Sequence, residues 1–216
     1  MKYDLIVSDY DGTLIKKNGE ISDEQLRTIN AYVSSGGKFT VITGRMTTSI
    51  LPLVRKLGLK GYVSSFNGGE LTEIESGKTL YSKKIKNSLA IEIYKIIESE
   101  NAYAHGYYCG QYFTPERTTF TDFYEKITFV KATLIDKKLS EHFTENKLDT
   151  NKILVMDDKE KLDRVMNALQ PYKDRLNIIR SNDFQIEITT PDATKGNALK
   201  YIAQEFNVPI EKTIAV

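Results

Sequence analysis

Strands and helices alternate through the first 65 residues of this 216-residue chain. Short apolar runs at residues 3–8, 38–43 and 62–65 are typical of buried strands, and helical patterns separate them at about residues 22–35 and 48–57. Successive strands joined by helices pair as parallel neighbours, so this order predicts βαβ units. The sequence therefore predicts an α/β fold built on a doubly wound parallel sheet.

The two helical segments carry recognisable signals. Ser22 and Gln25 are spaced as a capping box, and Gly36 with Gly37 should end the first helix. The second helix contains Pro52, which is expected only in a first turn because proline donates no backbone hydrogen bond. The apolar positions expected to form the buried stripe of the first helix are Leu26, Ile29 and Val33.

The middle of the chain has a different pattern. Residues 70–83 predict a hairpin, residues 87–100 an amphipathic helix, and residues 102–114 short antiparallel strands. Residues 116–147 favour neither helix nor strand. Later elements are expected as a strand at 152–156, a helix at 159–169, strands at 176–180 and 185–189, a helix at 195–206 and a strand at 213–216.

This change of pattern predicts an insertion. We expect residues 1–81 and 189–216 to form the core domain, and residues 82–188 to form an inserted α+β domain. About a hundred residues are enough for an independent hydrophobic core.

Composition excludes several classes of function. The formal net charge is +1, so nothing supports binding to nucleic acid. The apolar run near the N-terminus covers only residues 5–7, which is too short for a signal peptide or a membrane span. A single cysteine, Cys109, excludes an internal disulfide and suits a reducing compartment. We therefore expect a cytoplasmic protein without nucleic-acid or membrane partners.

Two aspartates, Asp9 and Asp11, directly follow the first predicted strand. Ligands of open parallel sheets bind beyond the carboxyl ends of the strands, and alternate positions there can turn both carboxylates toward one site. Gly12 allows a tight turn, and Thr13 offers a hydroxyl and an N–H group. The alternative interpretation is an ordinary strand-end turn, in which Asp and Gly are common.

The pair suits phosphoryl transfer. A carboxylate is ionised at neutral pH and needs no base to act as a nucleophile, which is the role expected of Asp9. Adjacent carboxylates repel each other, and Mg²⁺ bound to Asp9 and to the backbone carbonyl of Asp11 would relieve this repulsion. Asp11, with its side chain held off the metal, could protonate the leaving alcohol and later activate water.

Three further positions could hold phosphate or substrate. Thr43, Gly44 and Arg45 end the second strand with a hydroxyl and backbone N–H groups, although a plain helix cap is the alternative. Lys195 opens a helix whose N-terminus attracts anions, although most surface lysines are merely solvated. Asn67 ends the third strand and either positions substrate or only forms a turn. These elements indicate a phosphate site jointly rather than singly.

Other reactive residues have no such pattern. His105, His142 and Cys109 lack metal-ligand spacing and are expected to be structural. The aromatic residues between 103 and 113 have no basic residue among them, so they favour a core of the insert over base stacking.

The ordered motifs together resemble the Cof-type branch of the haloacid dehalogenase superfamily. They are Asp9-Tyr10-Asp11-Gly12-Thr13-Leu14, Thr43-Gly44-Arg45, Asn67-Gly68-Gly69 and Lys195-Gly196-Asn197-Ala198-Leu199. The resemblance spans the whole chain and implies a Rossmann-like core with a large α+β cap of type IIB. It also implies Mg²⁺-dependent hydrolysis of small phosphate monoesters, often sugar phosphates or related metabolites, through an aspartyl-phosphate intermediate.

Family roles carry over to matching positions. The resemblance implies that Asp9 is the nucleophile and Asp11 the acid and base. Thr43 and Lys195 become phosphate ligands. The expected contacts with phosphate or substrate are completed by Gly12, Thr13, Gly44, Arg45 and Asn67.

One family motif has no counterpart here. The fourth motif, a Gly-Asp followed shortly by Asn-Asp, is expected directly after residues 213–216. The chain stops at Val216, so the further acidic metal ligand is expected beyond Val216 and is absent from these 216 residues. Two alternatives therefore stand beside the phosphatase: a truncated, catalytically impaired fragment that binds a phosphorylated metabolite, and a phosphomutase of the same superfamily.

Overall fold

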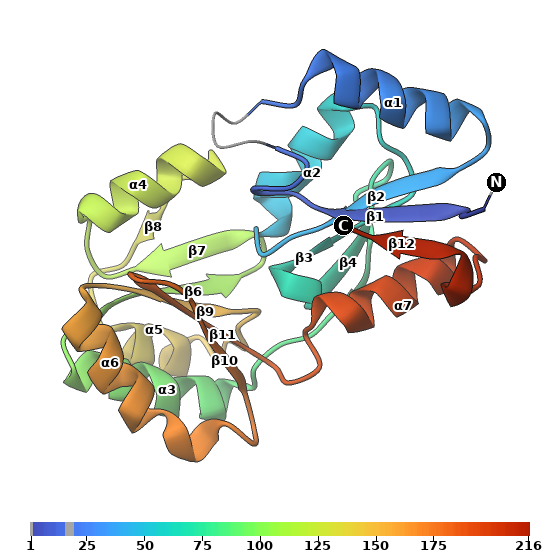
Figure 1. Cartoon of the computed structure of the whole chain (residues 1–216). Coiled ribbons are helices and arrows are strands. Elements are labelled where there is room, and N and C mark those ends of the chain that lie inside the picture. The colour runs from blue at the N-terminus through green and yellow to red at the C-terminus, as the bar shows by residue number, and fades with distance from the viewer. Residues whose placement is uncertain (1, 16–19) are drawn as a thin grey trace. The chain divides into compact units, whose positions relative to one another are not determined.

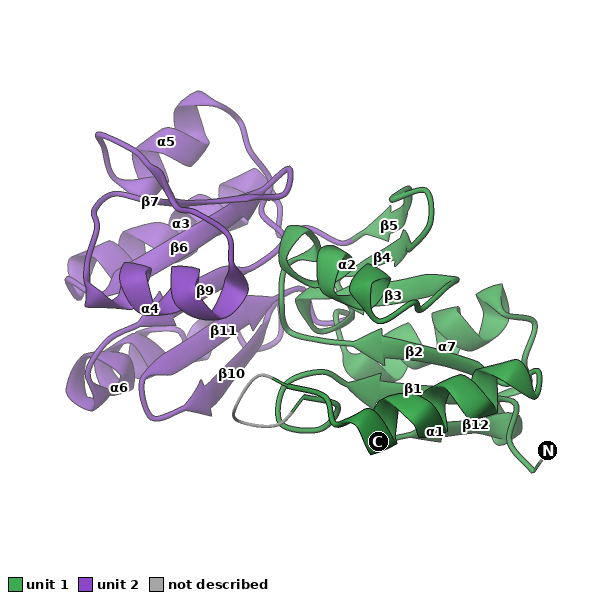
Figure 2. Cartoon of the chain, turned by 90° about the horizontal axis from the view of Figure 1, so that it is seen from above, with its two compact units in different colours: residues 1–82, 193–216 green, residues 83–192 purple. Residues whose placement is uncertain are grey.

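A computed structural model of the chain describes residues 2–15 and 20–216 (Figure 1). It divides into two compact units, which are Met1–Ser82 with Ala193–Val216 (unit 1) and Lys83–Asp192 (unit 2) (Figure 2). Within the described residues, each unit is built on its own six-stranded sheet. Across this same part of the chain, every helix is too short or too polar to cross a bilayer.

The sheet of unit 1 has the order β12-β1-β2-β3-β4-β5. Its parallel strands are β12 (Thr213–Ala215), β1 (Leu5–Asp9), β2 (Lys38–Ile42) and β3 (Tyr62–Ser65), and β4 (Glu70–Glu73) and β5 (Thr79–Ser82) form the predicted antiparallel hairpin. The chain runs from β1 to β2 and β3 on one side, and β12 returns on the other side of β1. Strand order therefore reverses at β1, and its last residue, Asp9, lies where such sheets bind ligands.

Helices cover both faces of this sheet, with α1 (Asp23–Ser34) and α2 (Thr47–Lys56) on one face and α7 (Lys195–Glu205) on the other (Figure 1). Phe39 and Val41 of β2 pack in one cluster with Ile50 of α2. Ile42 packs in another cluster with Ile202 of α7. Burial on both faces explains why β1 and β2 carry apolar residues at consecutive positions, which is typical of a parallel sheet.

The predicted capping box of α1 is confirmed. The Ser22 hydroxyl accepts the Gln25 N–H at 3.2 Å, and the Gln25 side chain accepts the Ser22 N–H at 3.1 Å. The predicted buried stripe is only half-buried at Leu26 and Ile29 and is wrong at Val33, whose exposed fraction is 44%. Tyr32 takes that place because its ring covers Gly37 and its hydroxyl donates to the Tyr3 carbonyl at 3.3 Å.

The expectation for Pro52 is also wrong. The helix α2 begins at Thr47, so Pro52 lies beyond its first turn. The helix tolerates the missing N–H because Ile50 and Val54 on either side of it are fully buried. Gly58 follows the C-cap residue Leu57 and ends the helix with a φ of 71°.

The sheet of unit 2 has the order β10-β11-β9-β6-β7-β8, and only β7 and β8 pair in parallel. This arrangement confirms the predicted mixture of antiparallel strands and helices in the middle of the chain. The strands are β6 (Tyr103–Tyr108), β7 (Gln111–Thr114), β8 (Thr133–Leu134), β9 (Ile153–Met156), β10 (Asn177–Asn182) and β11 (Gln185–Thr189).

Helices again lie on both faces of the sheet (Figure 1). On one face, α3 (Asn87–Ser99), α5 (Leu139–Glu145) and α6 (Lys159–Ala168) enclose the apolar core of unit 2. On the other face, α4 (Thr119–Thr128) covers an aromatic layer. There Tyr124 lies 4.8 Å from the ring of His105 and 5.1 Å from that of Tyr112 between ring centroids. Burial, helped by nearby Lys152, lowers the pKa of His105 to about 3, so the imidazole is neutral.

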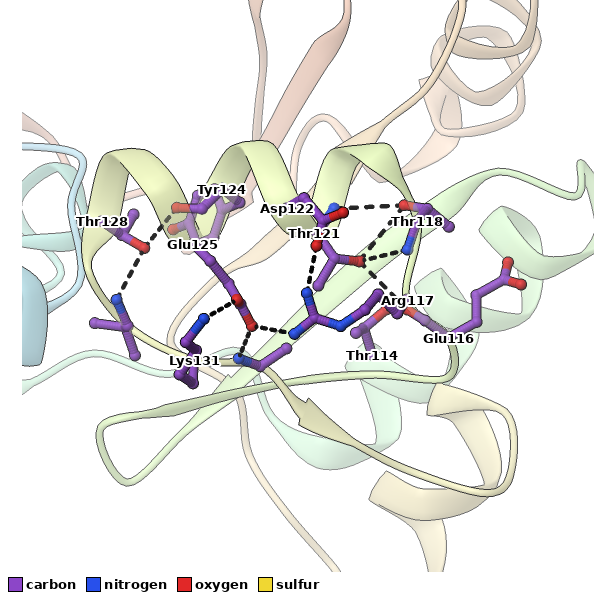
Figure 3. A network of polar contacts seen from close by, with 12 residues as sticks. Thr114, Glu116, Arg117, Thr118, Thr121, Asp122, Tyr124, Glu125, Thr128 and Lys131 are labelled. Atoms are coloured by element: carbon purple, nitrogen blue, oxygen red, sulfur yellow. Dashed lines mark hydrogen bonds and ion pairs between the residues drawn. The ribbon is translucent and has the colours of Figure 1, made fainter.

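A polar network around Glu125 fixes the C-terminal end of α4 (Figure 3). This carboxylate is buried, with an exposed fraction of 7%. It accepts hydrogen bonds from Arg117 at 2.8 Å, Lys131 at 2.7 Å and the Ala132 N–H at 2.9 Å. The network therefore ties the segment after α4 back onto the helix.

The first and last residues of unit 2 meet. The Lys83 ammonium lies 2.9 Å from the Asp192 carboxylate and donates to the Asp192 carbonyl at 3.0 Å. The ion pair joins the two points at which the chain enters and leaves the unit.

Candidate active site

A tight loop after β1 presents the two aspartates. The Gly12 N–H donates to the Ile15 carbonyl at 2.9 Å, and the Ile15 N–H donates to the Tyr10 carbonyl at 2.9 Å. Gly12 has a φ of 79°, a conformation that glycine adopts without steric cost. Tyr10 is buried, whereas Asp11 is exposed, so the loop turns the aspartate away from the core.

Asp9 is paired with Lys195. The Lys195 ammonium lies 2.8 Å from Asp9 Oδ2, and Asp9 Oδ1 accepts the Tyr10 N–H at 2.8 Å. Lys195 is the first residue of α7, and the Thr194 side chain caps that helix by accepting the Asn197 N–H at 3.2 Å. The fold thus brings the lysine motif from near the end of the chain to the end of β1.

Asp11 is paired with Arg45. Arg45 Nε donates to Asp11 Oδ2 and Arg45 Nη2 to Asp11 Oδ1, both at 2.8 Å. The Arg45 guanidinium also lies over the Tyr10 ring, with its Cζ 5.1 Å from the ring centroid. Burial raises the pKa of Tyr10, although Arg45 acts in the opposite direction, so the phenol is neutral.

The ends of β2 and β3 are tied together. The Thr43 carbonyl accepts the Asn67 N–H at 2.9 Å, and the Thr43 hydroxyl accepts the Arg45 N–H at 3.2 Å. Asn67 has a φ of 57°, in the left-handed region. A Cβ on Gly44 would lie 2.9 Å from Asn67 Oδ1, so only glycine leaves room for this asparagine.

The structure thus brings Asp9 next to Lys195, Asp11 next to Arg45, and Thr43 with Gly44 next to Asn67. Thr13 is exposed, and in the described residues no hydrogen bond or ion pair joins it to these groups.

Sequence reasoning missed Ser49. Its hydroxyl lies 3.4 Å from Arg45 Nη1 and accepts a hydrogen bond from it. Ser49 is buried and follows Arg45 by four residues at the start of α2. Arg45 precedes the extended N-cap residue Met46 and is therefore outside α2, so helical periodicity could not have indicated this contact.

The donors at the loop suit magnesium. The described residues hold no group of three or more His, Cys, Asp or Glu side chains that could bind a metal ion. Mg²⁺ nevertheless binds through one or two protein carboxylates when water and phosphate oxygens complete its octahedron. Asp9 offers a carboxylate oxygen, and the Asp11 carbonyl accepts no backbone hydrogen bond from the described residues. This donor set fits Mg²⁺ in that manner.

Comparison with known families decides the membership of the chain. The family model described as haloacid dehalogenase-like hydrolase matches residues 6–216. The chain belongs to the haloacid dehalogenase-like hydrolases. The match confirms the superfamily predicted from the motifs, and the two sheets with their helices confirm the predicted fold class.

Relatives of this hydrolase cover nearly all of its length. Phosphatase YwpJ from Bacillus subtilis is 26% identical over 235 residues, which are 98% of this chain and 82% of the relative. The crystal structure of a haloacid dehalogenase-like hydrolase from Bacteroides thetaiotaomicron has a TM-score of 0.87 at 24% identity and covers 99% of this chain and 80% of that one. The HAD subclass IIB sugar phosphatase BT4131 has a TM-score of 0.81 at 16% identity, with 98% and 79% covered, which shows a shared fold.

Proposed function

We propose that this hydrolase cleaves small phosphate monoesters and that Asp9 is phosphorylated during turnover. The observation that carries the proposal is the position of Asp9, at the point where strand order reverses and beside the ammonium of Lys195. The names of two similar proteins, a phosphatase and a sugar phosphatase, support sugar phosphates or related metabolites as the substrate class.

In the first step, an Asp9 oxygen attacks phosphorus, and the bond from phosphorus to the ester oxygen breaks. Asp11 supplies a proton to the departing oxygen, so an alcohol leaves. In the second step, Asp11 takes a proton from water, and the water oxygen attacks phosphorus. The bond between phosphorus and Asp9 breaks, which releases inorganic phosphate and restores both carboxyl groups.

The remaining residues bind the phosphoryl oxygens or shape the site. Lys195 and the N-terminus of α7 offset their negative charge, and the Thr43 hydroxyl adds a hydrogen bond. Gly44 and Asn67 keep the ends of β2 and β3 in register beside this group. Mg²⁺, when held by the Asp9 carboxylate and the Asp11 carbonyl oxygen, supplies Lewis-acid neutralisation of phosphoryl charge.

The variant Asp9→Asn tests the proposal. We expect it to lower phosphate release by about a thousandfold or more, because the amide is a far weaker nucleophile. Release is measured with Mg²⁺ on p-nitrophenyl phosphate and a panel of sugar phosphates. The matched control is Asp23→Asn, at an exposed position of α1, which should leave the rate unchanged. Equal rates for wild type and Asp9→Asn would refute the nucleophile.

A further inference from the structure

The hydrogen-bonding edge of Arg45 is already used within the site. Guanidinium groups hold carboxylates and phosphates through two parallel N–H bonds. In this chain the Nε and Nη2 groups of Arg45 make that pair of bonds, each 2.8 Å long, to the two oxygens of Asp11. A phosphoryl group would therefore have to displace Asp11 before it could bind the same edge.

Neighbouring groups hold the guanidinium in this orientation. Its Nη1 donates to the Ser49 hydroxyl at 3.4 Å, and its Cζ lies 5.1 Å from the centroid of the Tyr10 ring. The backbone of Arg45 is held as well, because its N–H donates to Thr43 Oγ1 at 3.2 Å and its carbonyl accepts the Phe66 N–H at 2.9 Å. Arg45 is thus fixed at both ends.

The side chains of Arg45 and Asp11 differ in their exposure to solvent. The Arg45 side chain is 15% exposed, whereas the Asp11 side chain is 54% exposed. The Arg45 side chain is therefore packed among its neighbours, whereas the Asp11 side chain is exposed to solvent. Because the Arg45 guanidinium is planar and held in place, its two N–H groups set the orientation of the Asp11 carboxylate that they bind.

A separate cation serves the nucleophile. Lys195 lies 2.8 Å from Asp9 Oδ2 and is the first residue of α7, and the N-terminus of a helix attracts anions. The two cations are thus assigned to different aspartates. In the part of the chain that the structure describes, the cation paired with the proposed nucleophile Asp9 is Lys195.

We propose that Arg45 is a positioning residue that aims the Asp11 carboxylate, and that it does not bind the phosphoryl group of the substrate. The proposal rests on the proposed function, in which Asp11 gives a proton to the leaving oxygen and takes one from water. Proton transfer requires hydrogen-bond distance and direction, so a misplaced carboxylate slows the chemical step without weakening substrate binding.

The variant Arg45→Lys separates positioning from phosphate binding. Lysine keeps the positive charge but cannot form two parallel bonds to a carboxylate. We expect kcat to fall by about 10²-fold, while KM and the inhibition constant of inorganic phosphate stay within about twofold. A phosphate ligand would behave in the opposite way: KM and the inhibition constant would rise together with little change in kcat. That result, or an unchanged kcat, overturns the proposal.

Two further variants test whether Arg45 orients Asp11. In Arg45→Ala, added guanidinium ion should restore part of kcat, whereas ammonium ion should not, because only guanidinium reproduces the two-point contact. Ser49→Ala removes the hydroxyl that holds Nη1 and should lower kcat in the same direction but by less than about tenfold. Equal rescue by both ions contradicts a role in orientation. Thermal unfolding of each variant verifies that it is folded.

A structural measurement separates this proposal from the proposed function. In the crystal structure of Arg45→Lys we expect the Asp11 carboxylate to leave its wild-type position by more than about 0.5 Å, the tolerance of a productive site. An unmoved Asp11 overturns the positioning role whatever the activity. Absence of phosphate release from wild type, with Asp11 displaced in the variant, instead counts against the proposed function alone.

Discussion

Charges at the end of β1 are balanced in pairs. Asp9 and Asp11 are two residues apart, and their repulsion by itself indicates a bound cation. The structure gives each carboxylate a cationic side chain, Lys195 for the first and Arg45 for the second. Which cation serves which aspartate could not be predicted, because both contacts join residues far apart in the chain.

Two glycines near this site differ in whether a larger residue would fit in their place. Gly68 has a φ of 101°, and a Cβ there would lie 2.3 Å from the Thr194 carbonyl oxygen. A Cβ on Gly196, in the first turn of α7, would meet nothing within 4 Å. The first position therefore requires glycine, and the second does not.

We expect Gly68→Ala to lower the free energy of unfolding by about 2–3 kcal/mol, through the clash and the left-handed backbone. Gly196→Ala, the matched control, should raise it by about 0.5–1 kcal/mol because alanine favours helix. Urea denaturation followed by circular dichroism measures both. An unchanged free energy of unfolding in Gly68→Ala would show that the backbone near Thr194 can move to accept a Cβ.

At the scale of elements, α4 depends on a buried carboxylate. Burial acts to raise the pKa of Glu125, but Lys131, the Ala132 N–H and Arg117 outweigh it and lower this pKa to about 2 (Figure 3). A carboxyl group whose pKa is lower in the folded state stabilises the fold above its unfolded-state pKa, and it loses this effect as pH falls toward the folded value.

The expected window lies between about pH 4.5 and pH 2. We expect wild type to exceed Glu125→Gln in stability by about 1–2 kcal/mol at pH 6, a value reduced for the exposure of Lys131. The difference should shrink as pH falls through this window. Thermal unfolding of both proteins from pH 6 to pH 2 measures it. A difference that is constant with pH would mean that the network does not favour the ionised carboxyl.

The segment around α4 also shows why some elements could not be predicted. Phe123 and Ile127 are 41% and 37% exposed, whereas Glu125 is buried, so the pattern of apolar residues does not mark the buried face. The strand β8 has two residues and α5 has seven, which is too short for a periodic signal. In contrast, α3 has a clear periodic stripe, and the sequence predicts its end to within one residue.

Across the whole molecule, alternation of strands and helices predicted the parallel sheet, but its strand order needed the structure. Placement of β12 beside β1 brings α7, and with it Lys195, to Asp9. The sequence pattern predicts helices and strands but not which of them are neighbours in space. The motifs therefore indicated a shared site, but not the contacts between its residues.

The two units have separate cores, which predicts separate folding. We expect a fragment of residues 83–192 to unfold cooperatively on its own, because its apolar cluster is enclosed by its own helices. Circular dichroism during heating measures the transition. The variant Phe143→Ala, at a fully buried position, should destabilise the fragment by about 3–5 kcal/mol. A fragment without a cooperative transition contradicts the expectation.

The ion pair between Lys83 and Asp192 has a consequence for chain entropy. For unit 1, an unfolded stretch of roughly 110 residues between β5 and α7 would be a long loop, whose closure costs about 4 kcal/mol in conformational freedom. When residues 83–192 are folded, the ion pair holds their two ends together, so this stretch behaves as a short loop. Substitutions that unfold residues 83–192 are therefore expected to weaken the sheet that carries Asp9 through the connectivity of the polypeptide.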